Sequence, residues 1–127
     1  MKEYMFYIRN DGKVLPADKE QEFLKKCEVY IEDLKKRGKL ISAQPLAREG
    51  KIIYKLAGAW NEEAYHKSSD VDAGYYHIRA TDLDDAVAIA KDNPEFIYRP
   101  SAKIEIHLIK TDEDSTGYIY PVENSPA

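Results

Sequence analysis

Apolar and polar positions along the first 38 residues predict a strand followed by a long helix. Residues 3–9 are rich in aromatic and branched side chains, which favour a strand, and an Asn-Asp-Gly turn signal follows them. Asp18 is expected to cap the helix, with Gln21 reaching back in a capping box, and Gly38 is expected to end it. The apolar stripe of this helix comprises Phe23, Cys27, Tyr30, Ile31 and Leu34.

Two strand-like runs, at residues 39–47 and 51–56, come next. They are joined by a short polar connection that ends in Gly50, so the sequence predicts a hairpin in which the two runs pair antiparallel. Residues 57–73 have no clean period, although residues 61–67 could form one helical turn. We interpret residues 57–73 as an insertion that leaves the sheet.

The segment 74–94 predicts a strand, a capped helix and an abrupt stop. Residues 75–80 favour a strand, Thr81 and Asp82 offer side-chain oxygens for an N-cap, and Pro94 cannot continue a helix. Between these ends apolar residues recur at helical spacing, at Leu83, Ala86, Val87 and Ala90.

A strict alternation at residues 104–109 predicts the last core strand. The order of elements therefore predicts an α+β fold over residues 1–110, with a ferredoxin-like antiparallel sheet and two helices on one face. Two helices cannot cover both faces of a sheet, so the other face is solvated or covered by a second chain. Residues 111–127 form an acidic tail in which only residues 118–120 are able to pair.

Side-chain parity predicts a polar and aromatic floor on the uncovered face. Tyr75, His77 and Arg79 share one face of their strand, and Glu105 and His107 share one face of theirs. If the strands are neighbours, His77, His107 and Glu105 could form a metal site or an acid/base cluster. The alternative is a hydrogen-bonded lining of a wet cavity, because two histidines without a definite third ligand are a weak metal signal.

Length, cysteine content and charge restrict the class of protein to which the chain can belong. The chain has 127 residues, enough for one domain, and its single cysteine cannot form an intramolecular disulfide, so a reducing cytoplasm is expected. No apolar run approaches the length of a membrane span, and a net charge of −4 argues against nucleic acid. The basic cluster at residues 35–39 is interpreted as a complement to a helix dipole. No phosphate-binding loop, nucleophile elbow or CxxC pair is present, and no cofactor is expected.

Several segments resemble the YCII-related family. EYMFYIR is similar to the family's opening strand, and GKLISAQPL is similar to the strand after its first helix. The most specific match is AGYYHIRATDLDDAVAIAKDNP, which resembles the family's aromatic pair, strand and second helix. Ala57-Gly58-Ala59-Trp60 stands where one branch carries an Asp-Gly-Pro-Phe signature, and it keeps the glycine and an aromatic residue.

The resemblance implies a homodimer in which two sheets close an α+β barrel, so that the polar floor becomes a cavity. In the wider family a His on the first helix and an Asp before a Pro after the second helix have been taken to imply an enzyme. Cys27 and Asn93 stand at these two positions here, so both chemical groups are missing. Cys27 by itself is either a buried structural thiol or a nucleophile that needs a lowered pKa.

Two further stretches contain candidate residues. Trp60 and His66 in the insertion could belong to a lid over the cavity, whereas the alternative is that Trp60 anchors the loop to the core or to the partner subunit. Residues 112–123 follow the spacing of a calcium loop, but a strand precedes them instead of a helix. We interpret this match as fortuitous.

Two functions stay open from the sequence. The first is the binding of a small organic molecule in a cavity enclosed by the dimer, with any catalysis unproven. Its candidate ligand-binding residues are Tyr75, His77, Arg79, Glu105, His107, Trp60 and His66. The second is an accessory or regulatory role through protein contacts, because genes of the signature-bearing branch often lie beside those of alternative sigma factors.

Overall fold

The computed structural model describes residues 1–65 and 70–121. Its elements are β1 (Lys2–Asn10), α1 (Ala17–Lys36), β2 (Leu40–Pro45), β3 (Lys51–Leu56), β4 (Ala59–Ala64), β5 (Val71–Ala80), α2 (Leu83–Lys91), α3 (Glu95–Tyr98) and β6 (Lys103–Leu108). The strands β2, β5, β1 and β6 form, in that order, an antiparallel sheet, and β3 pairs with β4 in a separate hairpin. The predicted α+β fold is confirmed.

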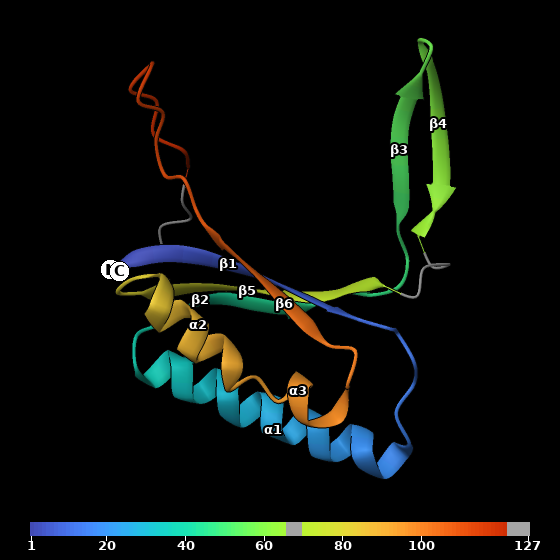
Figure 1. Cartoon of the computed structure of the whole chain (residues 1–127), viewed down its shortest axis with the longest axis vertical. Helices are drawn as coiled ribbons and strands as arrows, with labels where there is room; N and C mark the ends of the chain where they lie inside the picture. The colour runs from blue at the N-terminus through green and yellow to red at the C-terminus, as the bar shows by residue number, and fades with distance from the viewer. Residues whose placement is uncertain (66–69, 122–127) are drawn as a thin grey trace.

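All three helices lie on one face of the sheet, while the hairpin and the C-terminal segment project from the opposite side (Figure 1). Two of these helices were expected, and the four-residue α3 is an addition. Inward-facing residues of β1 and β5 pack against the helices because alternate side chains of a strand point to one face. The buried apolar core comprises Tyr4, Phe6, Ile8, Leu34, Tyr76, Ile78, Ala80, Ala86, Ile89 and Ala90.

The predicted pairing of residues 39–47 with 51–56 is wrong. β2 pairs with β5, and β3 pairs with β4. Residues 59–64 therefore lie outside the four-stranded sheet, as expected, but they form a strand where the start of a helical turn over residues 61–67 was considered. The reason is the two-residue turn at Ala57 and Gly58, which both have positive φ, as tight hairpin turns require. Residues 71–73, also assigned to the insertion, begin β5.

The two main helices begin differently. Asp82 caps α2 as predicted, since its side chain accepts a hydrogen bond from the Asp85 N–H at 2.8 Å. The capping box predicted for α1 is wrong: this helix begins at Ala17 after Pro16, and no side chain caps it. Proline suits such a start because it has no N–H to satisfy.

The C-terminal segment folds back on itself. Ile119 forms an isolated antiparallel bridge with Asp112, and the Tyr120 N–H donates to the Thr111 carbonyl. Tyr118 and Tyr120 stack edge to face. Residues 122–127, which include the last position of the calcium-loop spacing, lie outside the described residues. Within the described part of the chain, no helix is long and apolar enough to cross a membrane.

Candidate functional site

The sheet face opposite the helices contains the residues predicted to form a floor. Met5 of β1 lies between His77 of β5 and His107 of β6, and Tyr7 lies between Tyr75 and Glu105. Paired residues of an antiparallel sheet share a face, so the two predicted sets lie on the same side. We call this surface the polar floor; it comprises Glu3, Met5, Tyr7, Tyr75, His77, Arg79, Glu105 and His107.

The two histidines of the polar floor are separated by β1, so the condition that their strands be neighbours is not met. Two strand spacings place their backbones roughly 10 Å apart. His77 Nε2 lies 2.7 Å from Glu3 Oε1, whereas His107 Nε2 lies 3.2 Å from Glu105 Oε2. Within residues 1–65 and 70–121, no group of three His, Cys, Asp or Glu side chains could hold a metal ion. The floor histidines therefore belong to separate hydrogen-bonded pairs.

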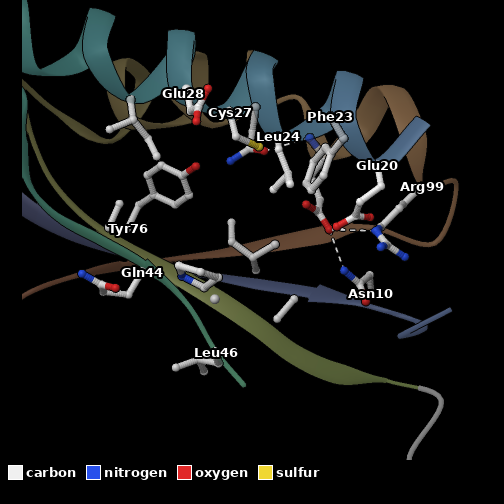
Figure 2. A pocket seen from close by; sticks show the side chains of 18 of the residues that line it. Asn10, Glu20, Phe23, Leu24, Cys27, Glu28, Gln44, Leu46, Tyr76 and Arg99 are labelled. Carbon is white, nitrogen blue, oxygen red and sulfur yellow. Dashed lines mark hydrogen bonds and ion pairs between the residues drawn. The ribbon is translucent and has the colours of Figure 1, made fainter. Parts of the chain in front are cut away.

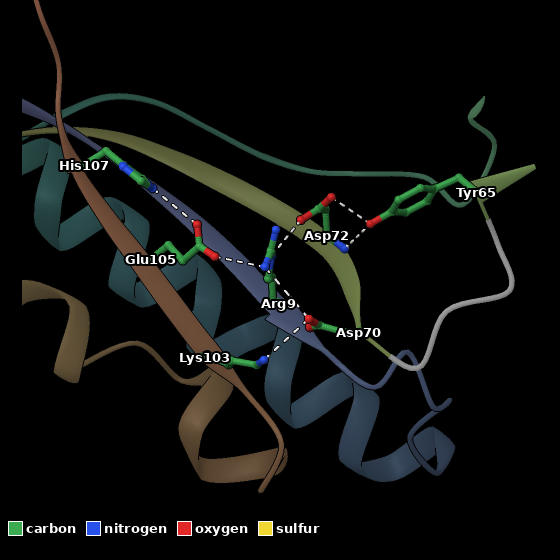
Figure 3. A network of polar contacts seen from close by, with 7 residues as sticks. All are labelled: Arg9, Tyr65, Asp70, Asp72, Lys103, Glu105 and His107. Carbon is green, nitrogen blue, oxygen red and sulfur yellow. Dashed lines mark hydrogen bonds and ion pairs between the residues drawn. The ribbon is translucent and has the colours of Figure 1, made fainter. Parts of the chain in front are cut away.

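An ion-pair network occupies one end of the polar floor (Figure 3). Arg9 lies 2.9 Å from Glu105 and 3.1 Å from Asp72. The Tyr65 hydroxyl donates to Asp72 Oδ2 and accepts from the Asp72 N–H, both at 2.7 Å. These contacts join Tyr65, which follows the hairpin, to the start of β5. The carboxylates of Asp72 and Glu105 balance the charge of Arg9.

Trp60, one of the two residues predicted for a lid, is not brought to the floor. Trp60 lies on β4 with 68% of its surface exposed, and Lys55 Nζ lies 4.8 Å from its ring centroid. His66 lies outside the described residues. Arg79 is exposed at the edge of the floor, and the Tyr75 hydroxyl lies 3.3 Å from Ser42 Oγ.

A cavity of about 520 Å³ lies on the other side of the sheet, between α1 and the strands (Figure 2). We call it the α1 pocket. Glu20, Phe23 and Cys27 point into it from α1. Its other lining residues come from α1, from the end of β1, and from β2 and the loop after it. The start of β5, the link between α2 and α3, and α3 with the residue after it supply the rest. Its volume is within the range of small-molecule sites.

Gly74 forms a close contact between strands at the wall of the α1 pocket. A Cβ at this position would lie 2.8 Å from the Gln44 carbonyl oxygen and 3.1 Å from Pro45 Cα. Glycine therefore lets β2 approach β5 closely, and the chain beyond β2 then continues along the pocket, where the Leu46 N–H donates to the Ala73 carbonyl.

A buried carboxyl group lies at one end of the α1 pocket. Glu95 accepts a hydrogen bond from Asn10 Nδ2 at 2.5 Å, and Arg99 Nε lies 3.4 Å from the same carboxylate oxygen. Burial raises the pKa of the Glu95 carboxyl above its ordinary value, and the bond from Asn10 and the charge of Arg99 oppose that shift.

Cys27 and Asn93, the two positions singled out by the family resemblance, line the same pocket. Burial, followed by the negative charges of Glu95, Glu20 and Glu28, raises the pKa of the Cys27 thiol to about 12. Cys27 is thus a neutral thiol at physiological pH and lacks the thiolate that a nucleophile needs. Asn93 is 3% exposed, and its Oδ1 accepts from the Glu95 N–H at 2.9 Å.

The model of the YCII-related domain matches residues 2–98, which is most of the chain. The chain belongs to the YCII-related family. In this YCII-related protein the matched region includes every residue that lines the α1 pocket except Arg99. No curated protein matches the chain in sequence.

Asn10, Glu95 and Arg99 are among the polar residues of the YCII-related pocket that sequence reasoning missed. The sequence does indicate that Asn10 is buried, because it continues the inward-facing positions Tyr4, Phe6 and Ile8 of β1. A polar side chain at such a position needs a buried hydrogen-bond partner. It was instead interpreted as part of the Asn-Asp-Gly turn. Glu95 and Arg99 had none, since no local pattern marks the first turn of a four-residue helix as buried.

Glu95→Gln is expected to remove a pH-dependent destabilisation of the fold. The pKa of Glu95 is raised in the folded protein, so folding opposes ionisation, and the wild type should lose stability as the pH rises from about 4.5 through the folded pKa. The glutamine amide in the variant can still accept from Asn10 but does not ionise. Urea unfolding from about pH 4 to about pH 8 should show the variant gaining on the wild type as the pH rises.

The exposed Glu49 provides the matched control. Glu49→Gln removes one carboxylate without changing a buried site, so its stability relative to the wild type should show no comparable trend. A Glu95→Gln difference that stays constant over the whole pH range would contradict the prediction.

Proposed function

We propose that this YCII-related protein binds a small organic molecule in the α1 pocket and acts as a homodimer. The observation that carries the proposal is the pocket itself. It combines a volume of about 520 Å³ with an apolar wall and a few buried polar groups at one end, which is the usual make-up of a ligand site. Phe23, Leu24, Ile31 and Ile8 supply apolar surface, and Asn93 and Glu95 supply the polar end.

Binding is supported better than nucleophilic or imidazole chemistry in this pocket. A thiol with a pKa near 12 holds its proton at neutral pH, and an asparagine amide neither gives nor takes a proton there. Cys27 and Asn93 therefore supply shape and hydrogen bonding, and neither acts as an acid or a base.

The dimer proposal rests on the surfaces opposite the helices. The polar floor lies on the side of the sheet from which the hairpin and the C-terminal segment project (Figure 1). The hairpin exposes Ile53, Leu56 and Trp60 by 63%, 66% and 68%. An isolated two-stranded hairpin is marginal in water, so contact with a further chain would stabilise it. A second copy is the proposed partner because a two-fold axis beside the polar floor would cover both floors and both hairpins at once.

Filling the α1 pocket tests the binding proposal. Cys27→Trp adds a bulky ring from α1 into the cavity, whereas Val29→Trp places the same ring on a position of α1 that is 70% exposed. In a thermal-shift screen of uncharged aromatic and aliphatic fragments, compounds should raise the Tm of the wild type and of Val29→Trp but not that of Cys27→Trp.

Ala43→Leu fills the same cavity from β2, so the test does not depend on one variant folding well. Both filled variants should unfold cooperatively without a fragment. The proposal fails if no fragment stabilises the wild type, or if the fragments stabilise the filled variants equally.

A further inference from the structure

The hairpin formed by β3 and β4 buries little of its surface in its own chain. All six residues of β3 are exposed, and so are five of the six residues of β4. None of the hairpin residues belongs to the buried core cluster of the described residues. Because a two-stranded hairpin is marginal in water by itself, a surface from outside the subunit would stabilise it.

One face of the hairpin combines apolar side chains with a cation. Lys55 and Trp60 are cross-strand partners, and Ile53 lies two residues before Lys55 on the same face. Lys55 Nζ lies 4.8 Å from the Trp60 ring centroid and has no carboxylate partner among the described residues, whereas Lys51 pairs with Glu62 at 2.8 Å. This face therefore offers apolar surface and an unbalanced positive charge.

The C-terminal segment that follows β6 has the complementary combination. Asp112 and Ile119 form its antiparallel bridge and so share a face, on which Ile119 is 74% exposed. Asp114 follows in the adjoining turn. Within the part of the chain that the structure describes, neither aspartate pairs with a cation, whereas the neighbouring Lys110 pairs with Glu113. The segment thus offers apolar surface beside unbalanced negative charge.

The hairpin and the C-terminal segment leave the sheet at diagonally opposite corners, on the side away from the helices (Figure 1). The hairpin follows β2 on one edge, where Pro45 pairs with Gly74 and Gly74 pairs with Ile8 near the end of β1. The C-terminal segment follows β6 on the other edge, where the Ile109 N–H donates to the Glu3 carbonyl near the start of β1. Strand rise and strand spacing put these corners roughly 20 Å apart, so the two faces are separated within one subunit.

A two-fold rotation brings the two kinds of corner together. When two polar floors face each other about an axis that lies between them and across this diagonal, the hairpin corner of each subunit is placed over the segment corner of the other. The same contact then forms twice. Because one chain carries both complementary faces, a second copy of this chain fits better than an unrelated partner.

We propose that in the homodimer the hairpin of each subunit docks on the C-terminal segment of its partner. Trp60 and Ile53 pack against the partner's Ile119, and Lys55 pairs with the free carboxylates of that segment. This inference rests on the proposed function, since it names the segments that join the two subunits.

Charge exchange tests the docking directly. Lys55→Glu places a carboxylate opposite Asp112 in both contacts and should weaken the dimer at least about 10-fold. Asp112→Lys should weaken it similarly. The chain with both substitutions keeps the net charge of −4. It should dimerise within about 3-fold of the wild type, because the pair is restored with its charges reversed. Sedimentation equilibrium of the full chain at physiological salt measures all of these affinities.

Two further variants complete the series. Asp114→Lys takes the place of Asp112→Lys in a parallel pair with Lys55→Glu, since both carboxylates are free of cations among the described residues. Lys25→Glu is the matched control, because Lys25 is exposed in the middle of α1 on the helical side of the sheet. The control should dimerise as the wild type does. Thermal unfolding checks that every variant folds.

The fluorescence of Trp60 gives an independent measurement, because it is the single tryptophan of the chain. Its side chain is 68% exposed in the single chain and is covered by the partner in the docked dimer. The emission maximum should therefore move to shorter wavelength as the protein concentration is raised through the dissociation constant of the dimer. Ile119→Ser removes apolar surface without adding charge and should reduce both this shift and the affinity.

The outcomes separate this inference from the homodimer itself. A wild type that stays monomeric at every concentration would overturn both. A dimer in which the emission of Trp60 does not move would overturn the inference alone. The same holds if neither doubly substituted chain regains the affinity that Lys55→Glu loses, because the hairpin would then dock on another surface.

Discussion

Ile78→Ala is expected to lower the free energy of unfolding by about 2–5 kcal/mol, a large fraction of the roughly 5–15 kcal/mol typical of a small domain. Ile78 is fully buried in β5, where it lies beside Tyr4 on one neighbouring strand and Leu40 on the other. Truncation removes buried methyl and methylene groups and leaves a cavity that the flanking strands cannot close. Urea denaturation of both proteins measures the loss.

Ile97→Ala is the matched control, because it deletes the same atoms from a side chain that is 64% exposed in α3. Its effect should stay within about 0.5 kcal/mol. If the two alanine variants lost similar stability, the assignment of the core to the layer between β5 and the helices would be wrong.

Tyr7→Glu is expected to weaken dimerisation by at least about 100-fold, which corresponds to about 3 kcal/mol. Tyr7 lies on strand β1 between Tyr75 and Glu105, and it is 43% exposed in the single chain. In a dimer that covers the polar floor, the new carboxylate would be desolvated beside Glu105 without a partner. Sedimentation equilibrium over a wide range of concentration should show a dimer for the wild type and a monomer for the variant.

Phe96→Glu controls for the added charge. Phe96 has the same exposed fraction, 43%, but lies in α3 on the helical side of the sheet, so this variant should remain dimeric. A wild type that is monomeric at every concentration, or equal dissociation of the two variants, would contradict the placement of the interface on the polar floor.

Patterns that depend on neighbouring residues predicted most of the fold. The segment 74–94 gave β5, the Asp82 cap and α2, because propensity, capping and proline effects act within one or two turns of chain. The pairing of β3 with β4 was missed because the turn between them places Ala57 at positive φ. Alanine rarely adopts this conformation, so the sequence does not indicate a turn there. Strand pairing is decided by such turns and by packing between distant segments.

The candidate site was predictable only in part. Parity correctly put Tyr75, His77, Glu105 and His107 on one face, but it could not show that β1 separates the histidines, because strand order is not a local property. The family resemblance singled out Cys27 and Asn93, and both line the α1 pocket.

The buried polar contacts of the α1 pocket join residues far apart in the chain. The bond between Asn10 and Glu95 spans 85 positions, and no periodicity carries information over that range. The same holds for Asn93 Nδ2 and Arg99 Nε, two buried nitrogens without a partner at hydrogen-bond geometry among the described residues, because their surroundings depend on how distant segments meet at one point in space.

A crystal structure of the full chain soaked with benzamide tests the central claim, that the α1 pocket is a ligand site, most directly. The account predicts electron density for the ring in the α1 pocket, beside Phe23 and Ile31. Benzamide bound on the polar floor over His77 instead, or an α1 pocket that holds only water while the ligand saturates the protein, would contradict it.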